Sequence, residues 1–248
     1  MSAAAPAARR ILAQARFETG TLLRNGEQLL VAILLPCAAL LALADTSLPS
    51  LGPGRRIDLA VPGVLALCVI SSAFTAQAIA TGFDRRYGVL RLLGVSPLGR
   101  GGLLGAKGIA VLAVEALQLV VIGGLGLALG WHPVWSGFLW GAVFAVAGSW
   151  AFVALALLLA GTLRAEGVLA MANLLWVALL ALGGVIVPRS QLPVGLSHLA
   201  AVLPSGALGD GLRAAFVHGR PAGVPLLVLL AWALAATVLA SRTFRWSD

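Results

Sequence analysis

The amino-acid sequence predicts an all-α membrane protein that crosses the bilayer six times. Of its 248 residues, 60% are hydrophobic and only 10% are charged, and the mean hydropathy is +1.00. Because soluble domains carry about 25% charged residues, the surplus apolar side chains of this chain must face lipid. The apolar runs are also too long and too unbroken for membrane strands, which alternate over about ten residues. Residues 1–248 are therefore expected to form a single transmembrane domain.

An amphipathic helix is expected over residues 9–25, ahead of the first span. At 100° per residue, its apolar face comprises Ile11, Leu12, Ala15, Leu22 and Leu23, and its opposite face comprises Arg9, Arg10, Arg16 and Arg24. This pattern is typical of an interfacial helix that binds membrane lipids on the cytoplasmic leaflet. A simple positively charged anchor is the alternative.

Six apolar runs are long enough to be transmembrane helices, which need about 20 residues. They cover residues 26–44, 59–82, 103–129, 137–160, 168–187 and 224–240. The first run is short and contains Pro36, so its boundaries are the least well defined.

The cations are distributed unevenly between the two sets of connecting segments. Five of the 17 lie in one set: Arg55, Arg56, Arg189, Arg213 and Arg220. The other twelve are Arg9, Arg10, Arg16, Arg24, Arg85, Arg86, Arg91, Arg100, Lys107, Arg164, Arg242 and Arg245. Because cytoplasmic segments carry the excess of arginine and lysine, both termini are expected in the cytoplasm of a bacterium, with the chain in the cell membrane. Nucleic-acid binding would instead need these charges on one face, and no nucleic-acid partner is expected.

Two connecting segments are longer and more apolar than a simple connection requires. Segment 83–98 places Phe83, Tyr87 and Leu90 at i, i+4 and i+7, which predicts a short helix whose apolar face docks into a groove of a partner protein. Segment 188–213 follows the fifth span and predicts re-entrant helices that enter the outer leaflet and return.

These two segments resemble the permease subunits of the ABC-2 family (type V-like) of ATP-binding-cassette exporters. The first motif runs Asp84-Arg-Arg-Tyr-Gly-Val-Leu90, then Ser96-Pro-Leu98 and Lys107. The second motif runs Gly184-Val-Ile-Val-Pro188, followed by Leu192-Pro193, Leu203-Pro204 and Leu212-Arg213. Both occur in order within the six-span map, so the resemblance covers essentially the whole chain.

The resemblance implies a coupling helix at 83–98 that fits a cleft of a separate ABC ATPase subunit. The residues that it assigns to coupling are Asp84, Arg85, Arg86, Tyr87, Gly88 and Leu90. It also implies a second permease subunit, identical or related, and ATP with magnesium on the partner subunit. The chain itself has no Gly-x-x-x-x-Gly-Lys-Ser/Thr loop, so it is expected to be a transport subunit and not an enzyme, with no cofactor of its own.

A few polar residues inside the predicted spans are candidates for a substrate pathway or a gate. Glu115 lies inside the third span, Gln118 follows at i+3 on nearly the same face, and Gln77 lies in the second span. The alternative is a structural hydrogen bond from Glu115 to Gln77, Ser71 or Thr75. The alternative function is an ion-gradient-driven carrier, or a membrane enzyme or scaffold that uses Glu115.

Two further expectations concern the cargo and metal binding. The apolar interior favours a lipophilic or amphiphilic cargo such as a drug, lipid or natural product. No metal site is expected, because the three histidines are too scattered to converge on one ion.

Overall fold

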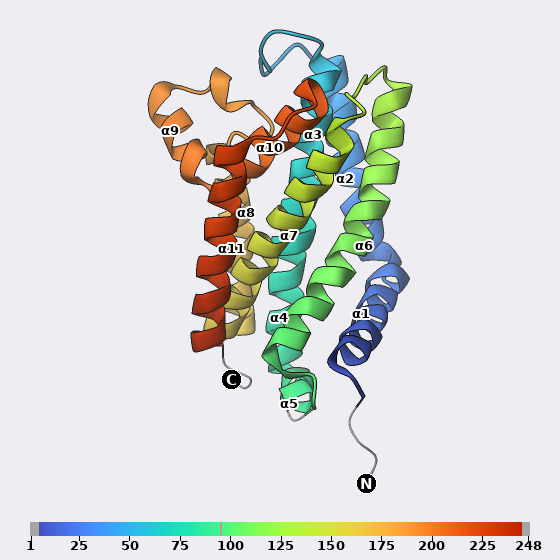
Figure 1. The fold of residues 1–248 in the computed structure, drawn as a ribbon, viewed down its shortest axis with the longest axis vertical. Helices are drawn as coiled ribbons and strands as arrows, with labels where there is room; N and C mark the ends of the chain where they lie inside the picture. The colour runs from blue at the N-terminus through green and yellow to red at the C-terminus, as the bar shows by residue number, and fades with distance from the viewer. Residues whose placement is uncertain (1–4, 95, 245–248) are drawn as a thin grey trace.

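The computed structural model describes residues 5–94 and 96–244. The structure is 82% helical, and the described residues contain no strand, which confirms the predicted all-α membrane protein. Figure 1 shows the long helices side by side in one bundle. At one end, here named the α5 end, α5 (Val89–Gly94) lies near the start of α1 (Ala7–Arg24) and the end of α11 (Gly223–Thr243). The opposite end carries α9 (Val194–Val202) and is named the α9 end.

The number of spans depends on how the first two helices are counted. α2 (Gly26–Asp45) follows α1 after a bend of 67° between the two helices. Within the described residues, five helices are long and apolar enough to cross a membrane. A sixth span results if the bent α1–α2 pair is counted as one.

α1 packs along α6 (Gly99–Ala128), but not with the whole apolar face that the sequence predicts. Ile11 lies against two glycines of α6, and Ala15 is buried. In contrast, Leu12 and Leu23 are 59% and 45% exposed, so these two residues of the face do not pack against the bundle. The reason is Glu18, which occupies the inward side of α1 because it pairs with a buried lysine of α6.

The second span is longer than predicted at both ends. α3 (Arg56–Val69), the π-helix η1 (Ile70–Ala76) and α4 (Gln77–Arg86) form one helical span in place of the predicted 59–82. Its two terminal regions are polar but still helical, because their arginines bind carbonyl groups of neighbouring segments. Arg56 Nε donates to the carbonyl oxygen of Leu43 at 2.5 Å, close to the end of α2.

Four further helices complete the set of candidate spans: α6, α7 (Gly137–Thr162), α8 (Ala165–Leu182) and α11. The fifth predicted span, 168–187, is displaced, because α8 begins earlier and ends at Leu182. The chain after it is apolar but turns at Gly184, whose φ is +65°. Hydropathy alone therefore extends this span beyond the real end of the helix.

The segment after α8 forms three short helices: η2 (Arg189–Gln191), α9 and α10 (Pro204–His218). α10 runs beyond the predicted limit of 213 and packs against α7, α3 and α11. Arg213 is buried and its guanidinium donates to the carbonyl oxygens of residues 184, 185 and 186.

Glycines allow α7 and α10 to approach closely. A Cβ atom at Gly137 would lie 1.9 Å from the carbonyl oxygen of Ala215, and one at Gly141 would lie 2.5 Å from the ring of Phe216. No larger residue fits at either position without moving α10. This contact fixes the α9 end of the bundle, while the candidate site lies at the α5 end and in the middle of the spans.

Candidate functional site

The predicted coupling segment is a corner between two helices and not one helix over 83–98. α4 ends at Arg86, Tyr87 follows, and α5 begins at Val89. Gly88 separates them with a φ of +75°, and its amide donates to the carbonyl oxygen of Arg85 at 3.0 Å. A glycine in the left-handed conformation just after a helix end is a common helix terminator. The prediction of a continuous helix is therefore wrong, because Gly88 turns the chain.

The turn changes which side chains face outward. The Phe83 and Tyr87 rings stack with centroids 6.1 Å apart, and Tyr87 is 72% exposed. Leu90, predicted to share their face, is instead completely buried. Among the described side chains of the corner, the exposed apolar ones are Tyr87, Val89 and Leu92, which we name the corner patch. Sequence periodicity missed Val89 and Leu92 because it assumed a straight helix through Gly88.

The two arginines of the motif bind within the chain. Arg85 is buried, and its guanidinium donates to the carbonyl oxygen of Ala160 at 2.7 Å and to that of Leu163, at the end of α7. Arg85 therefore holds the corner against the end of α7 from within the chain, and its role in coupling stays a prediction. Arg86 forms an ion pair with Glu166 in the first turn of α8. The corner is thus attached to α7 and α8.

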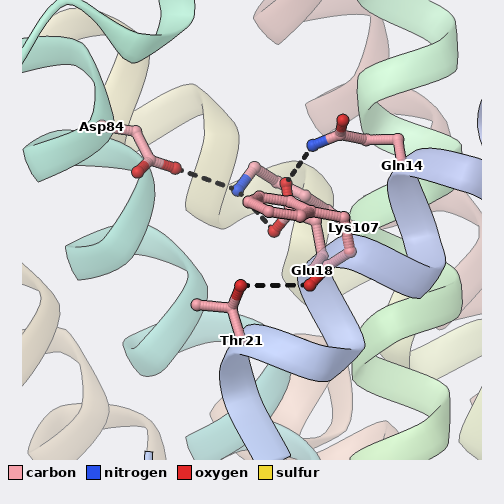
Figure 2. Close-up of polar contacts among 6 residues, drawn as sticks. Gln14, Glu18, Thr21, Asp84 and Lys107 are labelled. Carbon is pink, nitrogen blue, oxygen red and sulfur yellow. Dashed lines mark hydrogen bonds and ion pairs between the residues drawn. The ribbon is translucent and has the colours of Figure 1, made fainter. Parts of the chain in front are cut away.

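A buried ion cluster attaches the same corner to α1 and α6. Lys107 of α6 is 1% exposed, and its Nζ lies 3.2 Å from Glu18 Oε2 and 3.4 Å from Asp84 Oδ2. Figure 2 shows the amino group of Lys107 between the two carboxylates, with Gln14 donating to Glu18. We name Glu18, Asp84 and Lys107 the ion triad. Glu18 was not predicted, although it is the single acidic residue of α1.

α1 makes one further contact with the corner region. The Arg10 guanidinium donates to the carbonyl oxygen of Pro97, in the segment between α5 and α6. α1 therefore contacts both the end of α4, through the ion triad, and the chain that follows α5.

The polar residues predicted inside the spans separate into different environments. Glu115 is buried and its Oε2 accepts a hydrogen bond from Ser149 Oγ of α7 at 2.6 Å. Gln118 is also buried; it accepts from Ser72 Oγ at 3.2 Å and donates to the carbonyl oxygen of Ala32 at 2.9 Å. The partner of Glu115 is thus on the fourth span, and not among the second-span residues that the sequence suggested.

A cavity of about 600 Å³ lies between α2, η1, α6 and α8. Gln77 lines it, together with Ser71, Ser72 and Thr75 of η1, whereas Glu115 and Gln118 do not. From α8, the Trp176 Nε1 donates to Ser71 Oγ at 3.0 Å. The wall is otherwise mainly aliphatic, with Leu67 of α3 and Val111 of α6 among its residues.

The described residues also include possible metal ligands and two cysteines. No three or more of their His, Cys, Asp and Glu side chains are grouped so that they could hold a metal ion. Cys37 and Cys68 are free thiols within apolar surroundings.

The bundle of apolar helices defines a multi-pass membrane protein, with a rigidly attached corner at one end and an apolar cavity between its spans. Comparison with family models shows that residues 9–217 match the ABC-2 type transporter family. The chain belongs to the ABC-2 family and is a membrane permease subunit of an ABC transporter. The comparison with curated proteins gives no match.

Proposed function

We propose that this chain is the transmembrane subunit of an ATP-driven exporter, and that the corner patch docks onto a separate ABC ATPase. The observation that carries the proposal is the corner itself. Tyr87 and Leu92 are 72% and 73% exposed in a corner that Arg85 and the ion triad attach to the neighbouring helices. Exposed apolar side chains on a rigid support suit a protein–protein contact.

The orientation of the chain in the membrane follows from the distribution of its arginines. The α5 end holds the ends of α1 and α11 as well as the corner, and most arginines precede or follow the spans at that end. The positive-inside rule then places the α5 end in the cytoplasm of a bacterial cell and the α9 end at the outer surface. In this orientation the corner patch faces the compartment that contains ATP.

The attachments of the corner support transmission of movement into the membrane. A push on the corner patch acts on α4, and through the ion triad on α1 and α6. α4 continues directly into η1, which lines the cavity. π-helical turns are frequent at functional sites, where the wider backbone eases local rearrangement. ATP and magnesium bound by the partner would drive the closure, and a second permease subunit would complete the pathway.

The cavity supports a lipophilic or amphiphilic cargo. Its volume lies within the 300–1,000 Å³ that is typical of small-molecule sites. None of the described residues that line it is ionisable, while serine, threonine and glutamine side chains contribute hydrogen-bonding groups. A mainly apolar molecule with an uncharged polar group fits such surroundings.

Co-purification with a candidate ATPase tests the docking. We expect Tyr87→Glu and Leu92→Glu to abolish co-purification and stimulation of ATP hydrolysis, because each places a charge in the apolar contact. Trp135→Glu is the matched control: Trp135 is 70% exposed, but it precedes α7, away from the corner. If the double variant Tyr87→Glu/Leu92→Glu retains both properties, the corner patch is not the docking surface.

Energy depletion separates the exporter from an ion-gradient-driven carrier. Export should stop when ATP is depleted while the proton gradient is maintained. Transport that continues under these conditions would favour the carrier.

A further inference from the structure

α1 presents an outward face that the ion triad leaves unused. Arg9, Arg16 and Arg24 are all exposed along this helix. The acidic residue of α1, Glu18, points inward and pairs with Lys107. Among the described side chains, none of these three arginines has an ion-pair partner, and their three positive charges lie on the outward face.

Large apolar side chains border these arginines. At 100° per residue, Leu12 and Leu23 lie on one side of the arginine stripe and Phe17 lies on the other. All three are exposed, with 70% of Phe17 accessible. A cationic stripe with apolar borders is typical of a helix in the headgroup region of a bilayer.

The position of α1 agrees with this environment. The bend of 67° between α1 and α2 turns α1 away from the direction of α2. The contacts of Ile11 with α6 and of Glu18 with Lys107 hold the rotation of the helix, so the arginine stripe points away from the bundle. α1 therefore lies at the end of the spans, with its charged face toward the surroundings.

We propose that the outward face of α1 is a binding surface for anionic lipid headgroups. The phosphate groups of lipids such as phosphatidylglycerol complement Arg9, Arg16 and Arg24, while Leu12, Phe17 and Leu23 enter the acyl region. Each arginine near an anionic membrane surface contributes roughly fivefold to association. This surface is independent of the corner patch, so the proposal stands or falls separately from docking of an ATPase.

Electron paramagnetic resonance of spin-labelled lipids tests the proposal on the full chain. The purified protein is reconstituted in phosphatidylcholine vesicles that contain a trace of spin-labelled phosphatidylglycerol or spin-labelled phosphatidylcholine. The measured quantity is the protein-immobilised fraction of each label. We expect phosphatidylglycerol to be immobilised preferentially, and we expect added salt to reduce this preference because the contact is electrostatic.

Two triple variants test which arginines cause the preference for phosphatidylglycerol. Arg9→Gln/Arg16→Gln/Arg24→Gln should reduce the ratio of the two immobilised fractions to about one. The matched control is Arg91→Gln/Arg164→Gln/Arg242→Gln, which removes the same charge from three exposed arginines outside α1. This control should retain most of the preference.

Two results would overturn the proposal. The first is an unchanged ratio in the α1 variant. The second is an equal loss in the control variant, which would assign the preference to the total charge of the α5 end. If an unchanged ratio in the α1 variant comes with loss of co-purification with the ATPase, this face is a protein contact and not a lipid-binding surface. Size-exclusion profiles equal to that of the natural chain show that both variants are folded.

Discussion

Substitution of Lys107 by methionine tests the ion triad, because methionine keeps the aliphatic volume and removes the charge. The Lys107 side chain is 1% exposed and lies between two carboxylates, at 3.2 Å and 3.4 Å. Removing one partner of a buried ion pair costs about 3–5 kcal/mol. Glu18 and Asp84 keep 15% and 34% of their side chains exposed, so water stabilises part of the carboxylate charge that Lys107 no longer pairs. We therefore expect a loss of about 3 kcal/mol.

The assay is thermal unfolding of the purified protein. For a chain of this size, about 1 kcal/mol lowers Tm by roughly 2–4 °C, so Lys107→Met should lower it by about 6–12 °C. The triple variant Lys107→Met/Glu18→Gln/Asp84→Asn has no unpaired charge and should recover more than half of this loss. A single variant with an unchanged Tm would refute the reasoning, and so would a triple variant no more stable than the single one.

Two further predictions concern Arg213 of the second motif and Gly88 of the first motif. Arg213→Met should lower Tm by more than Lys107→Met, because it leaves three buried carbonyl oxygens without donors, at about 1–3 kcal/mol each. The Tm of Arg213→Lys should lie between those of the natural chain and Arg213→Met. Equal Tm values for the two Arg213 variants would contradict this prediction. Gly88→Ala should cost about 1–2 kcal/mol of backbone strain at the corner, because the φ of Gly88 is positive, and it should reduce stimulation of the ATPase. The control is Gly101→Ala, at a helical glycine with equally open surroundings. This control should reduce neither the stability of the chain nor the stimulation of the ATPase.

Hydropathy and charge predict most of this fold because they report the contact of side chains with lipid and water. They fail where a helix continues through polar residues. Arg85 appears as a loop residue in the hydropathy pattern, yet it is helical because its guanidinium binds the end of α7. The opposite error occurs after α8, where an apolar stretch continues but Gly184 turns the chain.

The candidate site is predicted less completely, since it depends on contacts between distant parts of the chain. The motif around Asp84 identified the corner, but not that Leu90 would turn inward after Gly88. Glu115 was recognised as a buried carboxyl group, yet its partner Ser149 lies 34 residues away in another span. No local pattern in a single sequence contains that pairing.

Site-specific cross-linking tests the proposed docking most directly. A photoreactive amino acid replaces Leu92 in the full chain, which is co-expressed with the candidate ATPase and irradiated in intact membranes. The proposal predicts a covalent adduct with the ATPase from position 92 and none from position 135. Absence of the adduct at 92 in a complex that co-purifies, or an adduct from position 135 instead, would contradict the assignment of the corner patch as the contact between the two subunits.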